Sequence, residues 1–193
     1  MYLLNRISLL TIAFSFFTSL TWAQNIRLID EVGVGLGVQF VADGLGPNLQ
    51  FSAARDLYHW KKGCLQAGVY ISIATSVPQD GTYIEEDSYI YRQMPQLYLS
   101  HDWMFFKGKL ILRNAIAAGR STLHVKGSIQ DDRWGFDESY DHKESFFTVQ
   151  HNHSLHFRIA KKSYLGLGMT IPITDRRLAT PLGVNLQYHY RFR

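Results

Sequence analysis

Apolar side chains recur at every second position along most of this chain, which is the period of a β-strand with one apolar face. In residues 31–42, for example, Val34 and Leu36 share one face and Gly35 lies on the other. The alternating segments are 31–42, 47–56, 64–75, 94–105, 109–125, 145–160, 164–174 and 182–192. The pattern predicts eight strands, each close to the 9–11 residues that cross a bilayer at a tilt.

The predicted connections alternate between short and long. The short ones are 57–63, Lys107-Gly108 and 161–163, and the others are 43–46, 76–93, 126–144 and 175–180. This alternation indicates an antiparallel up-and-down meander whose short turns lie on the periplasmic side. Segment 109–125 needs one adjustment, because Leu123 has the opposite parity to Leu112. We expect a β-bulge near Gly119 to reconcile the two.

The polar face is rich in Gly, Ser, Gln and Asn and has few Lys or Glu, which favours a narrow lumen over a water-exposed surface. The apolar face would then point into lipid. Lipid cannot hydrogen-bond a free strand edge, so the sheet must close into a barrel. A soluble exported barrel of the lipocalin type, with its apolar face inside, is the alternative.

Residues 1–23 have the organisation of a signal peptide. Arg6 precedes an apolar stretch from Ile7 to Leu20, and Thr21 and Ala23 stand at the −3 and −1 positions of a cleavage site. We therefore expect an exported chain, with the barrel domain spanning residues 24–193. The single cysteine, Cys64, leaves no internal disulfide to support the fold. The formal net charge of +4, which includes Arg6, is too dispersed to indicate a nucleic-acid partner.

The closing segment alternates apolar and aromatic residues and ends close to a Phe. Its positions are Leu186, Tyr188, Tyr190 and Phe192, followed by Arg193. This segment resembles the C-terminal assembly signal of outer-membrane β-barrel proteins, and the whole layout is similar to small eight-stranded barrels of the OmpA/OmpX type. The resemblance implies the bacterial outer membrane as location. It also implies lipid and lipopolysaccharide as surroundings and the barrel-assembly machinery as a partner during insertion.

Charged residues of the lumen should pair with each other, because an unpaired charge in a narrow interior is costly. The residues assigned to this network are Arg55, Asp102, Arg113, His156, Arg158, His189 and Arg191. Asp102 is the one clear in-strand carboxylate facing these cations. A structural plug is the expected role, and an anion-preferring pore is the alternative.

The sequence predicts no catalytic residue, cofactor or metal centre. His151 and His153 share one strand face, and proximity to the lipid headgroups would explain them there. Metal ligation is the alternative, with His124 as one candidate for a third ligand. Ser154 and His156 also share a face, but that face is the lumen, where a lipid substrate cannot enter. The His-x-Ser-Asn pattern of lipid A deacylases is absent.

The segment 126–144 combines acidic and aromatic residues, a composition that can bind cations, sugars or a partner protein. Its candidate binding residues are Asp131, Asp132, Trp134, Asp137 and Glu138. We expect an all-β, non-enzymatic outer-membrane barrel with a structural role or an adhesive role through its loops toward an unidentified extracellular partner. A lipid A-modifying enzyme and a soluble ligand-binding barrel are the alternatives.

Overall fold

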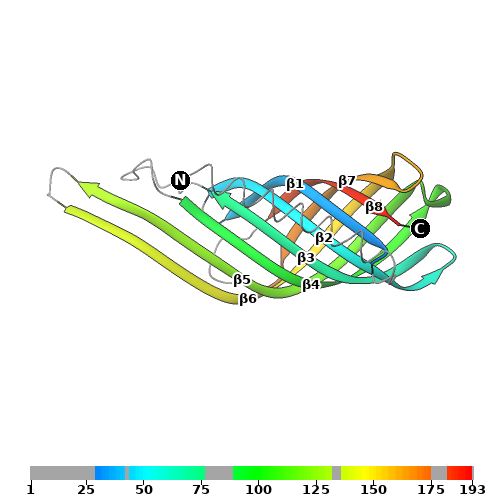
Figure 1. Cartoon of the computed structure of the whole chain (residues 1–193), viewed down its shortest axis with the longest axis horizontal. Helices are drawn as coiled ribbons and strands as arrows, with labels where there is room; N and C mark the ends of the chain where they lie inside the picture. Colours follow the sequence, from blue (N-terminus) through cyan, green and yellow to red (C-terminus); the bar gives the residue numbers. More distant parts are fainter. Residues whose placement is uncertain (1–28, 42–43, 77–88, 132–135, 175–181, 193) are drawn as a thin grey trace.

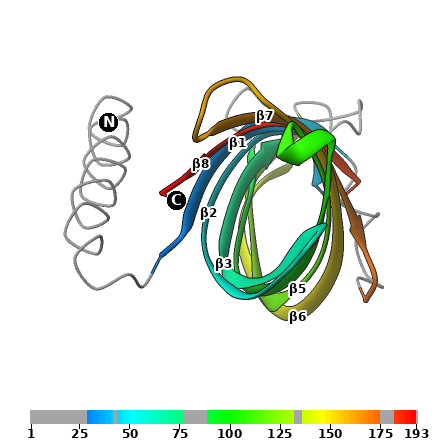
Figure 2. The same ribbon diagram turned by 90° about the vertical axis from the view of Figure 1, so that its right-hand side faces the viewer.

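The computed structural model describes residues 29–41, 44–76, 89–131, 136–174 and 182–192, and within them the chain forms a closed antiparallel barrel (Figures 1 and 2). The strands are β1 (Glu31–Val41), β2 (Gly44–Trp60), β3 (Gly63–Ser76), β4 (Tyr89–Phe105), β5 (Leu110–Asp131), β6 (Phe136–Arg158), β7 (Ser163–Pro172) and β8 (Gly183–Arg191). A 3-10 turn, η1 (Phe106–Gly108), joins β4 to β5. The prediction of an eight-stranded up-and-down barrel is confirmed. The predicted signal peptide lies outside the described residues.

Each strand pairs with its neighbours in the chain, and β1 pairs with β8 to close the ring. Leu36 of β1, for example, faces Leu49 of β2 on one side and Leu186 of β8 on the other. The described residues contain no helix that is long and apolar enough to cross a membrane.

The apolar face of the sheet points outward, as predicted. Leu36, Leu97 and Leu167 expose 64%, 70% and 60% of their surface, whereas Gln66 and Gln150 expose 0% and 1%. Buried amides and exposed leucines are the reverse of a water-soluble barrel, since a soluble protein buries its apolar side chains. The soluble, lipocalin-like reading is therefore wrong.

The lumen is packed in layers from one end of the barrel to the other. Charged groups fill the end with the short turns, and Tyr70 and Tyr98 are buried above them. The opposite end is closed by an apolar cluster of Val41, Ala74, Ile90 and Leu123. Side chains thus fill most of this narrow interior, as expected for eight strands.

The bulge predicted near Gly119 is wrong. Strand β5 keeps one register against β6 from Leu110 to Asp131, and Leu123 faces the lumen because the lumen itself is apolar at that level. Gly119 has a different role. A Cβ atom there would lie 2.3 Å from the carbonyl oxygen of Pro95, so the absent side chain lets β4 and β5 approach closely.

The predicted loop at 126–144 is also wrong, since β5 runs to Asp131 and β6 begins at Phe136. Figure 1 shows these two strands projecting as a long hairpin far beyond the rest of the barrel. Strand β4 accompanies β5 only as far as Lys126, and β7 accompanies β6 only as far as Gln150. Beyond these residues the hairpin stands as a two-stranded ribbon.

Candidate functional site

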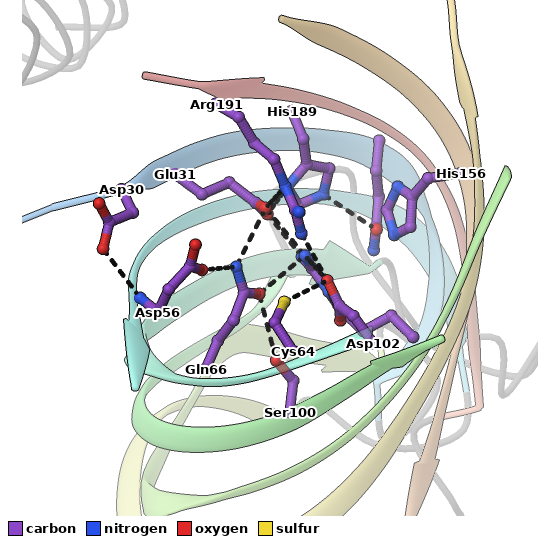
Figure 3. A network of polar contacts seen from close by, with 12 residues as sticks. Asp30, Glu31, Asp56, Cys64, Gln66, Ser100, Asp102, His156, His189 and Arg191 are labelled. Carbon is purple, nitrogen blue, oxygen red and sulfur yellow. Dashed lines mark hydrogen bonds and ion pairs between the residues drawn. The ribbon is translucent and has the colours of Figure 1, made fainter. Parts of the chain in front are cut away.

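The main concentration of charged side chains inside the barrel lies at its turn end (Figure 3). It is built on Glu31 at the start of β1, Asp102 in β4, Arg113 in β5 and Arg191 at the end of β8. We call these four residues, with Gln66 and His189, the ion cluster. Each side chain faces the lumen because it shares parity with the polar face of its strand.

Arg113 is the centre of the ion cluster. Its Nε and Nη2 donate to the two oxygens of Asp102 at 2.7 and 2.8 Å, and its Nη1 and Nη2 donate to those of Glu31 at 2.6 and 2.9 Å. This is bidentate pairing on two sides of one guanidinium. Nη2 also donates to Oε1 of Gln66 at 2.8 Å.

Arg191 completes the charge balance. Its Nε donates to Glu31 at 2.7 Å and its Nη2 to Asp102 at 2.5 Å, so each carboxylate contacts both arginines. Two carboxylates and two guanidiniums give formal neutrality. Balanced and hydrogen-bonded charges are what a buried network requires, because each unpaired charge would be expensive.

Neighbouring polar groups take up the remaining hydrogen-bonding capacity. His189 Nδ1 lies 2.7 Å from Glu31, Gln66 Nε2 donates to Asp56 at 2.6 Å, and the thiol of Cys64 lies 3.8 Å from Asp102. Gln66 and Asp102 are both fully buried. The arrangement is a rigid plug built from side chains of β1, β3, β4, β5 and β8.

The structure places five of the seven predicted lumen residues in the ion cluster or against it: Asp102, Arg113, His156, His189 and Arg191. The predictions for Arg55 and Arg158 are wrong, because both are exposed. Arg55 has the parity of Leu49, Phe51 and Ala53 and therefore points outward. Arg158 has lumen parity, but it is the last residue of β6 and lies at the rim.

Sequence reasoning missed Glu31, so the expectation that Asp102 is the one clear in-strand carboxylate is wrong. The signal was present, since Glu31 has the same parity as Gly33, Gly35 and Gln39. Glu31 is the first residue of the stretch, so no residue before it in the alternation marks its face.

Ser154 and His156 form a buried pair in the lumen, with Ser154 Oγ 2.7 Å from His156 Nε2. The ring of His156 packs edge-on against that of His189, with centroids 4.6 Å apart. The cavity beside Ser154 has a volume of about 50 Å³. That volume holds one or two water molecules and no acyl chain. The geometry of a serine nucleophile is therefore present without space for a substrate.

His151 and His153 lie on the outward face of β6, with ring centroids 3.9 Å apart. His153 Nδ1 is 2.6 Å from Oδ1 of Asn114. Their neighbours across the sheet are Asn114 and Ile116 on β5 and Met169 and Ile171 on β7. The proximity of this pair to the lipid headgroups stays a prediction.

The proposed third metal ligand does not join this pair. His124 lies on the projecting hairpin, where its Nε2 is 2.6 Å from Asp141. On β5, His124 lies eight residues beyond Ile116, which is the residue that pairs with His151. Among the described residues, no three His, Cys, Asp or Glu side chains are grouped to hold a metal ion.

Three of the five candidate binding residues of the long segment lie in the described part of the hairpin. Asp131 ends β5, and Asp137 and Glu138 are in β6, so these three belong to strands. Asp132 and Trp134 lie outside the described residues. The C-terminal signal residues lie on β8 or next to it, with Leu186 and Tyr188 exposed on the outward face.

No sequence profile of a known protein family matches the chain, and no curated protein sequence matches it. Solved structures do. Neisserial surface protein A superposes with a TM-score of 0.51 at 9% identity, over 84% of this chain and 96% of that one. Ail, the attachment invasion locus protein of Yersinia pestis, gives 0.49 at 14% identity, over 86% and 100%. The N-terminal β-barrel domain of Pseudomonas aeruginosa OprF gives 0.48 at 9% identity, over 85% and 98%. The likeness to the Neisserial protein shows a shared fold, that of the small outer-membrane barrels.

Proposed function

We propose that this chain is a small integral outer-membrane protein that holds a rigid β-hairpin outside the cell to bind an extracellular partner. The observation that carries the proposal is the length of β5 and β6, which have 22 and 23 residues. A strand needs only about 9–11 residues to cross the bilayer. The surplus is a two-stranded extension, which a purely structural barrel would not require.

The membrane part of the proposal rests on the apolar outward face described above. Leu36, Leu97 and Leu167 are all more than half exposed, and water would not favour such a belt. The lumen supports a structural role for the barrel rather than a pore, because the ion cluster fills one end and the apolar cluster closes the other.

The hairpin offers a partner both side chains and backbone. Along β6, no described strand pairs with residues 136–148 on the side away from β5. The hydrogen bonds of Val149 show which backbone groups of β6 face this open edge. The amide of Val149 donates to Thr174 Oγ1 and its carbonyl accepts from Ile173, and both partners lie on the β7 side. Strand geometry alternates, so the amides of Phe147 and Ser145 also point to the open edge. An extended segment of another protein can add there by backbone pairing.

The first test removes the hairpin while keeping its register. Because Val125 pairs with His142, whose amide points to β5 by the same alternation, residues 126–141 can be replaced by an Asn-Gly turn that closes a shorter hairpin at that pair. Cells producing this variant should keep a folded barrel in the outer membrane, with heat-modifiable migration on unboiled gels. Their adherence to neighbouring cells and to polysaccharide-coated surfaces under flow should fall to that of cells lacking the protein.

A second variant tests backbone pairing of a partner with β6, because it leaves the rest of the hairpin in place. Ser145→Pro removes one amide from the open edge and keeps the backbone ladder to β5, and proline is tolerated at such positions. Ser145→Ala is its control, since both variants lose the hydroxyl that lies 3.0 Å from Thr122 Oγ1. The proline variant should weaken adherence while the hairpin stays intact. Unchanged adherence in both the shortened-hairpin and the proline variants would refute the binding role, and release of the protein with the soluble periplasmic fraction would refute the membrane location.

A further inference from the structure

The three turns at the end of the barrel that holds the ion cluster each carry a pair of lysines. The pairs are Lys61 and Lys62 between β2 and β3, Lys107 and Lys109 between β4 and β5, and Lys161 and Lys162 between β6 and β7. We call these six residues the lysine ring. Figures 1 and 2 show that the three turns lie together at one end of the barrel, the end at which β1 begins and β8 finishes.

In the described part of the chain, the turns of the lysine ring carry no acidic residue that could neutralise it on the surface. Segments 57–63, 103–110 and 157–163 contain no Asp or Glu. The nearest carboxylates in those strands point inward, since Asp102 is fully buried in the ion cluster and Asp56 pairs with His59 at 3.0 Å. Arg158, exposed at the same rim, adds a further positive charge.

An apolar and aromatic rim stands directly beside the lysines. Phe106 is 75% exposed next to Lys107, Phe157 and Ile159 are exposed before Lys161, and Trp60 immediately precedes Lys61. Rings at such positions lie at the boundary between hydrocarbon and headgroups. The five exposed lysines that begin there extend their ammonium groups into the headgroup layer. Lys162 is half-buried at the same rim, where its ammonium donates to the carbonyl oxygen of Phe192 at 2.7 Å.

The opposite end of the molecule differs in charge. On the described part of the hairpin, Lys126 and Lys143 are exposed, but they alternate with Asp141 and Glu144. Positive charge without counter-charge is therefore a property of the turn end, and it is repeated on three separate turns of different sequence. That repetition favours a ligand that surrounds the barrel over one that binds a single turn.

We propose that the lysine ring is a binding site for the phosphate headgroups of anionic phospholipids in the leaflet that contains the turns. This inference rests on the proposed function, which places the apolar belt in a membrane. The ring would fix the depth and direction of the barrel in the bilayer, since six ammonium groups at one rim favour only one leaflet.

The test uses the barrel domain, residues 24–193, reconstituted in phosphatidylcholine vesicles, with W103F and W134F leaving Trp60 as its one tryptophan. Brominated phosphatidylglycerol or brominated phosphatidylcholine is titrated in, and quenching of Trp60 reports which lipid lies beside Lys61 and Lys62. One lysine at an anionic surface is worth about fivefold in binding. We expect phosphatidylglycerol to be preferred by at least about fivefold, and the preference to weaken in 0.5 M salt.

The variant K61Q/K62Q should reduce that preference to near unity. Its matched control, K126Q/K143Q, removes the same charge from the other end and should leave the preference unchanged. Equal quenching by both lipids in the parent protein, or equal losses in both variants, would overturn the lysine ring as a lipid site. Failure of the parent to float with the vesicles would instead overturn the proposed function.

Discussion

Replacing Arg113 by methionine tests whether the ion cluster stabilises the barrel. Arg113 is buried and makes five hydrogen bonds, two to each of Glu31 and Asp102 and one to Gln66. Methionine fills similar space without charge or donors. The two carboxylates would then share Arg191 as their remaining guanidinium, which leaves one buried negative charge unbalanced.

Removal of one partner from a buried ion pair costs about 3–5 kcal/mol, because the other charge stays desolvated. We expect R113M to lower the free energy of unfolding by that amount. The measurement is a urea titration of the protein in phospholipid vesicles, followed by the gel shift between folded and unfolded forms.

A charge-balanced double variant provides the control. D102N/R113M removes one charge of each sign and leaves Glu31 paired with Arg191 at 2.7 Å. We expect the double variant to lose less stability than the sum of the two single variants, by about 1–3 kcal/mol of coupling. An R113M protein within about 1 kcal/mol of the parent, or strictly additive losses, would refute the reasoning.

Three further predictions follow from the lumen and the hairpin. Gly37→Ala should cost about 1–3 kcal/mol in the same titration, since its Cβ would lie 2.1 Å from the carbonyl oxygen of Val184; Gly35→Ala, with 3.2 Å to its nearest atom, should cost less. Planar bilayers containing the parent protein should show no reproducible conductance steps, because side chains fill the lumen; regular steps would contradict this. The hydrogen bond from His124 lowers the pKa of the Asp141 carboxyl, so this contact should persist above the ordinary aspartate pKa and be lost as the pH falls through the lowered value. Carboxyl NMR shifts should show His124→Asn returning the midpoint toward about 3.9, and an unchanged midpoint would count against the contact.

The strands and their faces could be predicted because lipid imposes a strict rule on the sequence. Every second residue in the bilayer must be apolar, and the abundance of Gln, Asn, Ser and Gly on the other face indicated a packed lumen. The same rule, followed consistently, would have placed Arg55 outward with Leu49 and Ala53, and Glu31 inward with Gln39. The errors at those two positions arose at the ends of the alternating stretches.

The projecting hairpin could not be predicted from that rule. Above the membrane both faces of a two-stranded ribbon meet water, so residues such as Lys126, His142 and Glu144 need no apolar alternation. Their polar composition has the appearance of a loop. The inward position of Leu123 could not be predicted for a related reason. The alternation rule assumes a lumen that is polar throughout, whereas this lumen changes from charged to apolar along its length.

The ion cluster also bears on the order in which the barrel assembles. Glu31 lies near the beginning of the folded domain, yet it binds Arg191, which is 160 positions later, and Arg113, which is 82 positions later. Contacts between such distant parts of a chain form late, since a long loop must close first. Before β8 is in place, Glu31 and Asp102 share Arg113 as their guanidinium, so one carboxylate charge is unbalanced. Neutralisation by Arg191 therefore coincides with the meeting of the first and last strands. A chain that ends before β8 would lack Arg191 and would keep one carboxylate charge unbalanced in the lumen.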